Sequence, residues 1–304
     1  MTRNNDTHRT YRRRMIRQLP ILGEKGQKKI SQTRLTVVGC GGTGSRFIEL
    51  SSLAGFLKIT AIDFDPLEMS NRNRFALGGV KDVGKPKVVI VKQKLEKRFP
   101  DVRIRALVAD ARSPGIWEQA SQADWLIDAT DSEDTRRSLS RKCAEDQIPV
   151  ISLGVGYNFQ EGKLVRAGCR ANRVGPGDPC LACQVLVEGR PEVRTRASLA
   201  TANAIVAGLG LELLLREVTG YSGRASLDEQ GIDRNGTLDG QPAARDVNFL
   251  FFDLLNWSLA AERLLPTAGC PDCEWLASWA KEPQPAAGTT ESGTEEPAGH
   301  EIPF

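Results

Sequence analysis

Short apolar runs alternate with amphipathic segments along the first half of the chain. Helical spacing marks residues 24–30, 86–99, 113–120 and 135–147, and apolar runs predict strands at 35–38, 59–62, 102–108, 125–128 and 149–153. Strands that alternate with helices predict an α/β fold with a doubly wound, mainly parallel sheet. In such a sheet the ligand lies at the carboxyl ends of the strands.

The pattern changes after residue 155. Residues 157–168 have the spacing of a hairpin, 198–218 predict a long apolar helix, and 247–254 predict a further strand. Asn203, Glu212 and Arg216 interrupt the helix, so we expect it to pack in a core or a dimer interface and not in a membrane. Residues 221–245 are rich in Gly and Asp and have the composition of an insertion.

A glycine turn follows the first predicted strand. Gly39, Gly41 and Gly44 have the G-x-G-x-x-G spacing, and Asp63 ends the next predicted strand. The first glycine permits a tight bend, the second lets backbone approach phosphate, and the third lets the helix pack on the strand. An acid about 20 residues after the turn accepts hydrogen bonds from ribose hydroxyls. The unit predicts a Rossmann-like nucleotide site, which by itself suits NAD or FAD as readily as ATP.

Polar side chains follow the ends of two predicted strands. Asp63 and Asp65 follow one strand, with Asn71 and Arg74 in its loop, and Asp131 follows another. Mg²⁺ and a triphosphate need such a set, because carboxylates hold the cation while Arg and Lys neutralise phosphate charge. Each residue also has an ordinary alternative: Asp65 could start a turn, Asn71 could be a cap, and Asp131 could N-cap the next helix.

Four of the seven cysteines form two C-x-x-C pairs, Cys180 with Cys183 and Cys270 with Cys273. Each pair can form a knuckle whose thiolates face one ion, so the sequence predicts a closed, structural Cys₄ zinc site. Such a site would pin a C-terminal antiparallel extension to the body of the protein. The alternatives are a redox dithiol and two unrelated buried pairs. The other three cysteines have the character of small buried residues: Cys40, Cys143 and Cys169.

Composition narrows the choice of partners. The formal net charge of +3 is close to neutral, so nothing global argues for nucleic acid. No apolar run approaches a membrane span and no signal peptide opens the chain, which predicts a cytoplasmic protein. We expect three parts: a basic arm at 1–33 that is either solvated or anion-facing, an enzymatic domain at 34–278, and a disordered acidic tail at 279–304.

The ordered series VVGCGGTGS, AIDFD, SNRNRF, GKPK and DATDS, followed by the two C-x-x-C pairs, resembles the E1-like activating enzymes. This family includes ThiF/MoeB/HesA-type adenylyltransferases and the activating enzymes of ubiquitin-like proteins. The resemblance runs from about Tyr11 to Cys273. It implies ATP-dependent adenylation, with release of pyrophosphate, of the C-terminal glycine carboxylate of a ubiquitin-like or sulfur-carrier protein. A conjugating enzyme or a sulfurtransferase is a further implied partner.

The resemblance also assigns roles to residues. It implies a homodimer in which Arg13, in the Y-x-R pattern that starts at Tyr11, reaches the partner's ATP, and it implies that Asp131 binds Mg²⁺. The implied catalytic set is Arg13, Asn71, Arg74, Lys87 and Asp131. The implied ATP-binding set is Gly39, Gly41, Gly42, Gly44, Asp63, Asp65, Ser70, Asn71, Arg74, Lys87 and Ser132.

Two departures from the family pattern stand out. Many relatives carry a cysteine just ahead of the long apolar helix, whereas this chain reads TRASLATAN there and has no cysteine between Cys183 and Cys270. We therefore expect the reaction to stop at the acyl-adenylate or to pass it to another protein's thiol. An oxyester on Ser198 or Thr201 is the alternative, although neither has an activating base nearby in sequence. The second departure is Ser132, where relatives commonly have Asn.

Three other functions compete with adenylation of a carrier protein. A tRNA-modifying dehydratase of the same superfamily would use similar ATP residues but would lack the paired C-x-x-C. An NAD-dependent oxidoreductase would leave Arg74, Lys87 and Asp131 without a role. A non-catalytic scaffold would have lost the ATP set, which is intact here.

Overall fold

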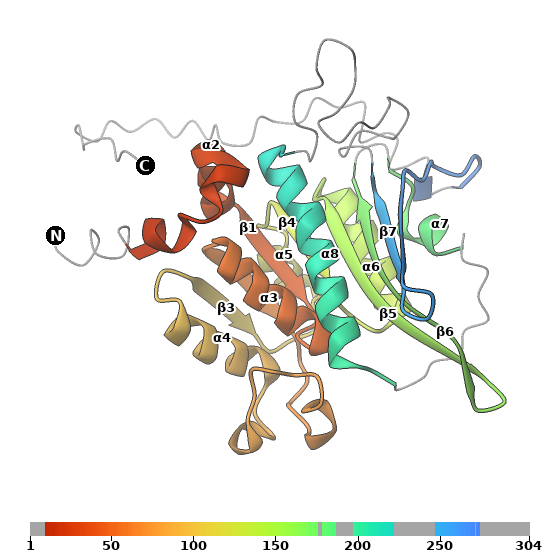
Figure 1. Ribbon diagram of the computed structural model, residues 1–304, viewed down its shortest axis with the longest axis horizontal. Helices are drawn as coiled ribbons and strands as arrows, with labels where there is room; N and C mark the ends of the chain where they lie inside the picture. Colours follow the sequence, from red (N-terminus) through yellow and green to blue (C-terminus); the bar gives the residue numbers. More distant parts are fainter. Residues whose placement is uncertain (1–9, 176–177, 187–196, 222–246, 271, 274–304) are drawn as a thin grey trace, which may run out of the picture.

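An eight-stranded sheet organises the chain in the computed structural model (Figure 1). The structure describes residues 10–175, 178–186, 197–221, 247–270 and 272–273. The strands lie in the order β3-β2-β1-β4-β5-β6-β7-β8, and β1 to β5 are parallel while β5 to β8 are antiparallel. This confirms the predicted mainly parallel sheet with an antiparallel extension.

The parallel half is close to its sequence prediction. Its strands are β1 (Arg34–Val38), β2 (Lys58–Ile62), β3 (Arg103–Leu107), β4 (Trp125–Asp128) and the first part of β5 (Val150–Gln160). The helices between these strands are α3 (Gly42–Ala54), α4 (Lys87–Arg98), α5 (Pro114–Ala120) and α6 (Glu133–Glu145), with the 3₁₀ turns η1 (Met69–Asn71) and η2 (Val80–Asp82) after β2. One cluster of buried side chains joins α3, α4 and α8 (Ala200–Thr219) to one face of the sheet, and a second joins α5 and α6 to the other.

The antiparallel half is longer than expected. The predicted hairpin at 157–168 is the tip of a larger one, formed by β5 and β6 (Lys163–Val174). After it come the short helix α7 (Leu181–Leu186), α8, β7 (Phe249–Asp253) and the edge strand β8 (Ser258–Glu262). The pattern SLAAE of β8 did not predict a strand, because four of its five residues are exposed at the edge of the sheet and little apolar alternation is needed there.

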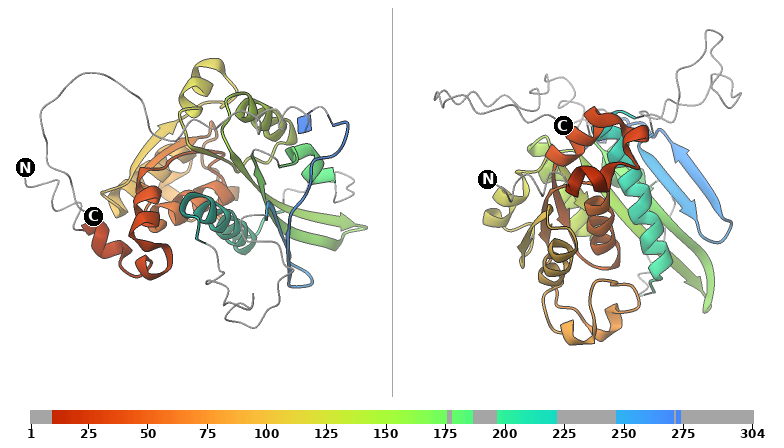
Figure 2. Two further views of the ribbon diagram at one scale, coloured as in Figure 1. Left: turned by 90° about the horizontal axis from the view of Figure 1, so that it is seen from above. Right: turned by 60° about the vertical axis from the view of Figure 1, so that its left-hand side comes forward.

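The basic N-terminal segment packs on its own chain. Residues 10–15 are helical, and α2 (Leu19–Gln32), which was expected only at 24–30, is kinked at Gly23 (φ 69°). Tyr11 is buried and donates a hydrogen bond to the carbonyl of Gly55, 3.2 Å away, where α3 ends. Figure 2 shows α2 lying across the ends of α3 and α8. The N-terminal segment therefore packs against the rest of the domain through these contacts.

Two expectations fall largely or wholly outside the described residues: the insertion at 221–245 beyond Tyr221 and the tail at 279–304. In the part of the chain that the structure describes, no helix combines the length and the apolar character needed to cross a membrane.

Candidate functional site

The glycine turn connects β1 to α3 at the carboxyl end of the sheet. Gly39 has a φ of +86°, and a Cβ there would lie 2.8 Å from the carbonyl oxygen of Ala129. A Cβ on Gly44 would lie only 1.8 Å from the carbonyl oxygen of Gly39, so this glycine lets α3 pack on the strand. A Cβ on Gly41 would meet nothing within 4 Å. The backbone at Gly41 is thus open to an incoming group, in front of the N-terminus of α3, where free N–H groups favour anions.

Asp63 is fixed beside this turn by its own backbone neighbours. Its carboxylate accepts hydrogen bonds from the N–H of Cys40 at 2.6 Å and from the N–H of Asp65 at 2.7 Å. Burial raises the pKa of this carboxyl group, an effect that the two backbone hydrogen bonds oppose. A carboxylate has about four acceptor positions, so two remain for ribose hydroxyls.

Lys87 is the most enclosed cation of the predicted set. It begins α4 and is only 8% exposed, and its Nζ lies 2.9 Å from the carboxylate of Asp65, which is half exposed. The N–H of Lys87 also donates to the carbonyl of Asp65 at 3.0 Å. Asp65 is therefore more than the start of a turn, because it binds the lysine that the resemblance places on the triphosphate.

The loop after β2 holds Asn71 and Arg74. Arg74 donates from Nη1 to the carbonyl of Ser70 at 2.9 Å and to Oδ1 of Asn73 at 3.0 Å, which turns its guanidinium back onto the loop. Asn71 accepts from the N–H of Glu68 at 3.2 Å and forms a capping box with it. The capping alternative for Asn71 therefore holds in this conformation, and η1 provides the frame on which both side chains sit.

Ser132 caps the helix α6, and the neighbouring Asp131 has an exposed carboxylate. Ser132 N-caps α6 by accepting from the N–H of Thr135 at 3.4 Å, so the capping alternative for Asp131 is wrong. Asp131 is exposed at the end of β4, and among the described residues it has no hydrogen bond or ion pair. Its carboxylate is thus available to a cation.

Sequence reasoning missed Asp128, the first acid of DATDS. Asp128 is 1% exposed and accepts hydrogen bonds from Thr130 (N–H at 3.0 Å, Oγ1 at 2.7 Å) and from Oγ of Ser152 at 2.8 Å. Arg136 of α6 lies 3.7 Å from the same carboxylate and donates to Ser152 at 2.8 Å. The signal in the sequence was the position of Asp128 at the end of an apolar strand, because a carboxylate placed there is buried and needs polar partners. Asp128 thereby orders the loop that presents Asp131.

Asn203 was noted only as an interruption of an apolar helix, but it links two parts of the site. It is 5% exposed; its Oδ1 accepts from Oγ1 of Thr43 at 2.7 Å, and its Nδ2 donates to Oγ of Ser198 at 2.9 Å and to the carbonyl of Leu199 at 2.7 Å. Asn73 donates to the carbonyl of Ser198 at 3.1 Å. The start of α8 is therefore bonded both to the glycine-turn helix and to the loop that carries Arg74.

The two C-x-x-C pairs converge on one point. The four sulfur atoms lie within 4.8 Å of one another, with Cys180 to Cys270 at 3.8 Å and Cys183 to Cys273 at 3.6 Å. Zn–S bonds of about 2.3 Å in a tetrahedron place the sulfur atoms about 3.8 Å apart, so the donor set and its spacing fit zinc. No disulfide joins these cysteines, and the separations of 3.8 and 3.6 Å are longer than an S–S bond of about 2.05 Å.

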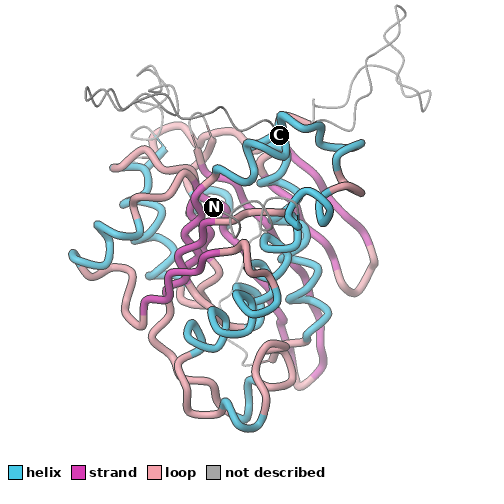
Figure 3. The backbone as a smooth tube through the Cα atoms, turned by 90° about the vertical axis from the view of Figure 1, so that its left-hand side faces the viewer, coloured by secondary structure: helices cyan, strands magenta, loops and turns pink. Residues whose placement is uncertain are grey.

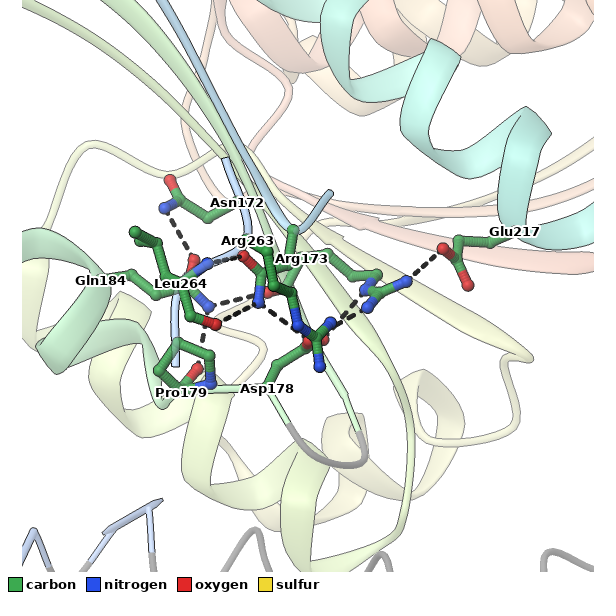
Figure 4. A network of polar contacts seen from close by, with 9 residues as sticks. Asn172, Arg173, Asp178, Pro179, Gln184, Glu217, Arg263 and Leu264 are labelled. Carbon is green, nitrogen blue, oxygen red and sulfur yellow. Dashed lines mark hydrogen bonds and ion pairs between the residues drawn. The ribbon is translucent and has the colours of Figure 1, made fainter. Parts of the chain in front are cut away.

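A buried network fixes the backbone next to the first knuckle (Figure 4). Asp178, two residues before Cys180, is 1% exposed and bonds Arg173 through both carboxylate oxygens at 2.9 and 3.0 Å. It also accepts from Arg263 at 2.9 Å and from Asn248 at 3.0 Å. These partners come from β6 and from both ends of the β7–β8 hairpin. The knuckle is therefore held to the antiparallel sheet by charge-assisted hydrogen bonds as well as by the cysteines.

The other three cysteines do not offer a nucleophile. Burial raises the pKa of Cys40 and Cys143 well above the ordinary value, and it raises that of Cys169 to about 12. All three are fully buried. A thiol of this kind stays protonated near neutral pH and is inert.

Comparisons with known proteins agree with this arrangement. A model of the ThiF family matches residues 11–245. The SAMP-activating enzyme E1 of Haloferax volcanii is 27% identical over 252 residues, which cover 83% of this chain and 84% of that protein. The sulfur carrier protein adenylyltransferase of Thermus thermophilus is 32% identical over 149 residues, which cover 49% of this chain and 54% of that protein.

A solved structure shares the fold. The crystal structure of E. coli MccB with ATP has a TM-score of 0.63 to this chain at 19% sequence identity. The superposition covers 82% of this chain and 69% of that one. At this identity the likeness supports the architecture of the sheet and its helices.

Proposed function

Because the chain belongs to the ThiF family of E1-like adenylyltransferases, we propose that it uses ATP to adenylate the C-terminal glycine carboxylate of a ubiquitin-like or sulfur-carrier protein. Pyrophosphate is the second product. The observation that carries the proposal is the grouping of an open glycine turn, the buried Lys87, the ordered Asp63 and the unpaired Asp131 at the carboxyl ends of β1, β2 and β4. A redox cofactor would use the glycine turn and Asp63, but it would leave Lys87, Arg74 and Asp131 without a role.

The chemistry requires positioning more than proton transfer. A carrier carboxylate is already ionised at pH 7, so it can attack the α-phosphate without a general base. Lys87 and Arg74 would neutralise charge on the phosphates, and Asp63 would hold the ribose. Lys87 would exchange Asp65 for the phosphates when ATP binds. The Asp65 carboxylate is half exposed, so water can solvate it once the lysine has left.

Two metal ions fit the residues present. Asp131 would hold Mg²⁺, which bound to ATP supplies further neutralisation of phosphate charge. The four cysteines would hold a structural zinc, and a closed Cys₄ shell leaves no position for a water molecule or a substrate. Zinc is thus assigned to stability and not to the reaction.

The product is proposed to be the acyl-adenylate itself. In the described residues around the start of α8, Ser198 has Oγ bonded to Asn203 and no His or carboxylate as an activating partner. The buried Cys40, Cys143 and Cys169 cannot substitute for a surface thiol. The adenylate would then be consumed by a thiol of a conjugating enzyme or a sulfurtransferase.

An ATP–pyrophosphate exchange assay with glycine-ending carrier proteins tests the proposal. We expect carrier-dependent exchange in the wild type and a loss of about 10²-fold in Arg74→Ala, because a cation that faces developing phosphate charge is removed. Arg72→Ala is the matched control, since Arg72 is an exposed arginine of the same loop. Background exchange with every carrier, together with no effect of Arg74→Ala, would refute adenylation.

A further inference from the structure

A groove lies on the α5 face of the sheet, away from the nucleotide site. It has a volume of about 440 Å³ and is lined by β1, β2 and β3, by the end of α5 and the residues after it, and at the outer edge by Lys92 and Glu96 of α4. Glu96 is the one carboxylate among the lining residues, and it is paired with Lys92 at 2.8 Å. Figure 3 views the molecule from the side on which β3 forms the edge of the sheet. At the carboxyl ends of these strands the row on this face is apolar and joins the core under α5: Val38, Ile62 and Leu107. The helix α5 therefore covers the carboxyl ends of these strands.

The next two rows toward the amino ends are polar and basic. They contain two threonines and four cations in cross-strand register: Thr36, Thr60 and Arg105, then Arg34, Lys58 and Arg103. Parallel strands that are covered on both faces normally read as continuous apolar runs. Here RLTVV, KITAI and RIRAL are each polar at the first and third positions. Thr36 is buried and donates to the carbonyl of Ala120 at 2.9 Å, so packing against α5 accounts for it. The four cations of these rows are exposed, and burial does not account for them: Arg34, Lys58, Arg103 and Arg105.

The cations are only partly neutralised by the protein. Arg34 is paired with Asp124 at 2.7 Å, and Arg103 donates to the carbonyls of Pro100 and Val102 at 2.6 and 3.0 Å. Among the described residues, the side chains of Lys58 and Arg105 have no hydrogen bond or ion pair, although their backbones are paired in the sheet. Like charges opposite one another on neighbouring strands are destabilising. An anion bound between them would relieve that repulsion.

The outer edge of β3 is closed to another strand. Lys92 of α4 donates to the carbonyl of Ile104 at 2.6 Å, and Glu96 accepts from the N–H of the same residue at 2.8 Å. These contacts satisfy backbone groups through which an added strand would pair. The groove therefore suits a ligand that contacts side chains on the face of the sheet.

We propose that this groove binds a small anion with two or more adjacent phosphate groups. Its volume is in the range of small-molecule sites, and side chains two residues apart on one strand lie about 6.6 Å apart, a spacing that adjacent phosphates can bridge. Guanidinium groups bind phosphate through two parallel hydrogen bonds, and Arg103 and Arg105 both face the groove. The site lies beyond the proposed adenylation chemistry and uses none of its residues.

Isothermal titration with inorganic triphosphate tests the site at low and high salt. The groove variant Lys58→Gln/Arg105→Gln should bind about tenfold more weakly than the wild type, because two unpaired cations are lost. The control Lys25→Gln/Lys163→Gln removes the same charge from exposed positions elsewhere and should change affinity by less than about twofold. The difference should persist in an Arg74→Ala background, which separates the groove from the nucleotide site.

Further titrations distinguish a nucleotide from a free polyphosphate, and a phosphate ligand from an acidic peptide. ADP in place of triphosphate reports whether a nucleotide or a free polyphosphate is preferred, and the charge-preserving variant Lys58→Arg/Arg105→Lys should restore binding. Thermal unfolding of each variant verifies folding. Equal triphosphate affinity in the wild type and the groove variant would overturn the proposal. Binding of an acidic peptide in place of triphosphate would overturn it as well.

Discussion

At the scale of single residues, Asn203 connects the nucleotide turn to the start of α8. Its amide is fully engaged, with Thr43 on one side and Ser198 and Leu199 on the other. A Cβ on Gly42 would lie 3.1 Å from the Asn203 side chain and 3.0 Å from that of Arg74, so glycine leaves room for both. A shift of this turn on nucleotide binding would therefore displace Asn203 and the two residues bonded to it at the start of α8, Ser198 and Leu199.

Asn203→Leu keeps the volume of the side chain and removes these hydrogen bonds. We expect the KM for the carrier protein to rise about tenfold, since net losses of 1 to 2 kcal/mol are typical when buried polar partners are left unpaired. The KM for ATP should change less. Steady-state exchange kinetics measure both.

A double-mutant cycle with Thr43→Val provides the control, because it removes the same hydrogen bond from the other partner. The effects of the two substitutions should be less than additive if the contact matters for carrier binding. Additive effects, or an equal rise in both KM values, would contradict a linking role for Asn203.

Among single residues, the sequence predicted the roles that depend on chain neighbours and missed those that depend on contacts between distant positions. The roles of Gly39, Gly44 and Asp63 follow from local spacing, because a turn and the strands beside it are built by neighbours in the chain. The bond between Thr43 and Asn203 joins residues 160 positions apart. No local pattern encodes such a contact, and the same holds for Asp178 with Arg263.

At the scale of elements, the same distinction applies. Buried strands such as β1 and β4 were predicted because their apolar runs reflect burial on both faces. The length of the β5–β6 hairpin, the edge strand β8 and the kink in α2 were not, since these depend on tertiary neighbours. The cysteine pairs were predictable across 90 residues because metal-ligand chemistry restricts the spacing within each pair.

Zinc should join these distant elements. Metal analysis of the purified chain should give about one zinc per subunit, and Cys273→Ser should abolish binding and lower the midpoint of thermal unfolding, because the ligand shell is incomplete. The matched control is Cys143→Ala, a buried cysteine outside the cluster, which should retain the metal. Chelation of zinc from the wild type should lower the midpoint as Cys273→Ser does. A metal-free chain with an unchanged midpoint would remove the Cys₄ assignment.

At the scale of the whole molecule, the helical segment at 10–15 has an inner and an outer side. Tyr11 and Met15 are buried, and Arg14 donates to the carbonyl of Ser52 at 2.6 Å and pairs with Asp101 at 2.6 Å. Arg13 is exposed between them. Tyr11, Arg14 and Met15 share one helical face and hold the segment to its own subunit. Arg13 is directed outward, which is the orientation needed for a residue that reaches a partner subunit.

If Arg13 completes the ATP site of a second subunit, its loss can be complemented. Arg13→Ala and Arg74→Ala should each lack exchange activity, but a mixed dimer contains one site with both defects and one with neither. Random subunit exchange makes about half of the dimers mixed, so activity should recover to roughly a quarter of the wild-type value. Arg12→Ala, whose exposed ion pair with Glu24 is expected to contribute little, is the control for charge loss in the segment. A monomer in sedimentation analysis, or a mixture that stays inactive after subunit exchange, would show that Arg13 does not act across an interface.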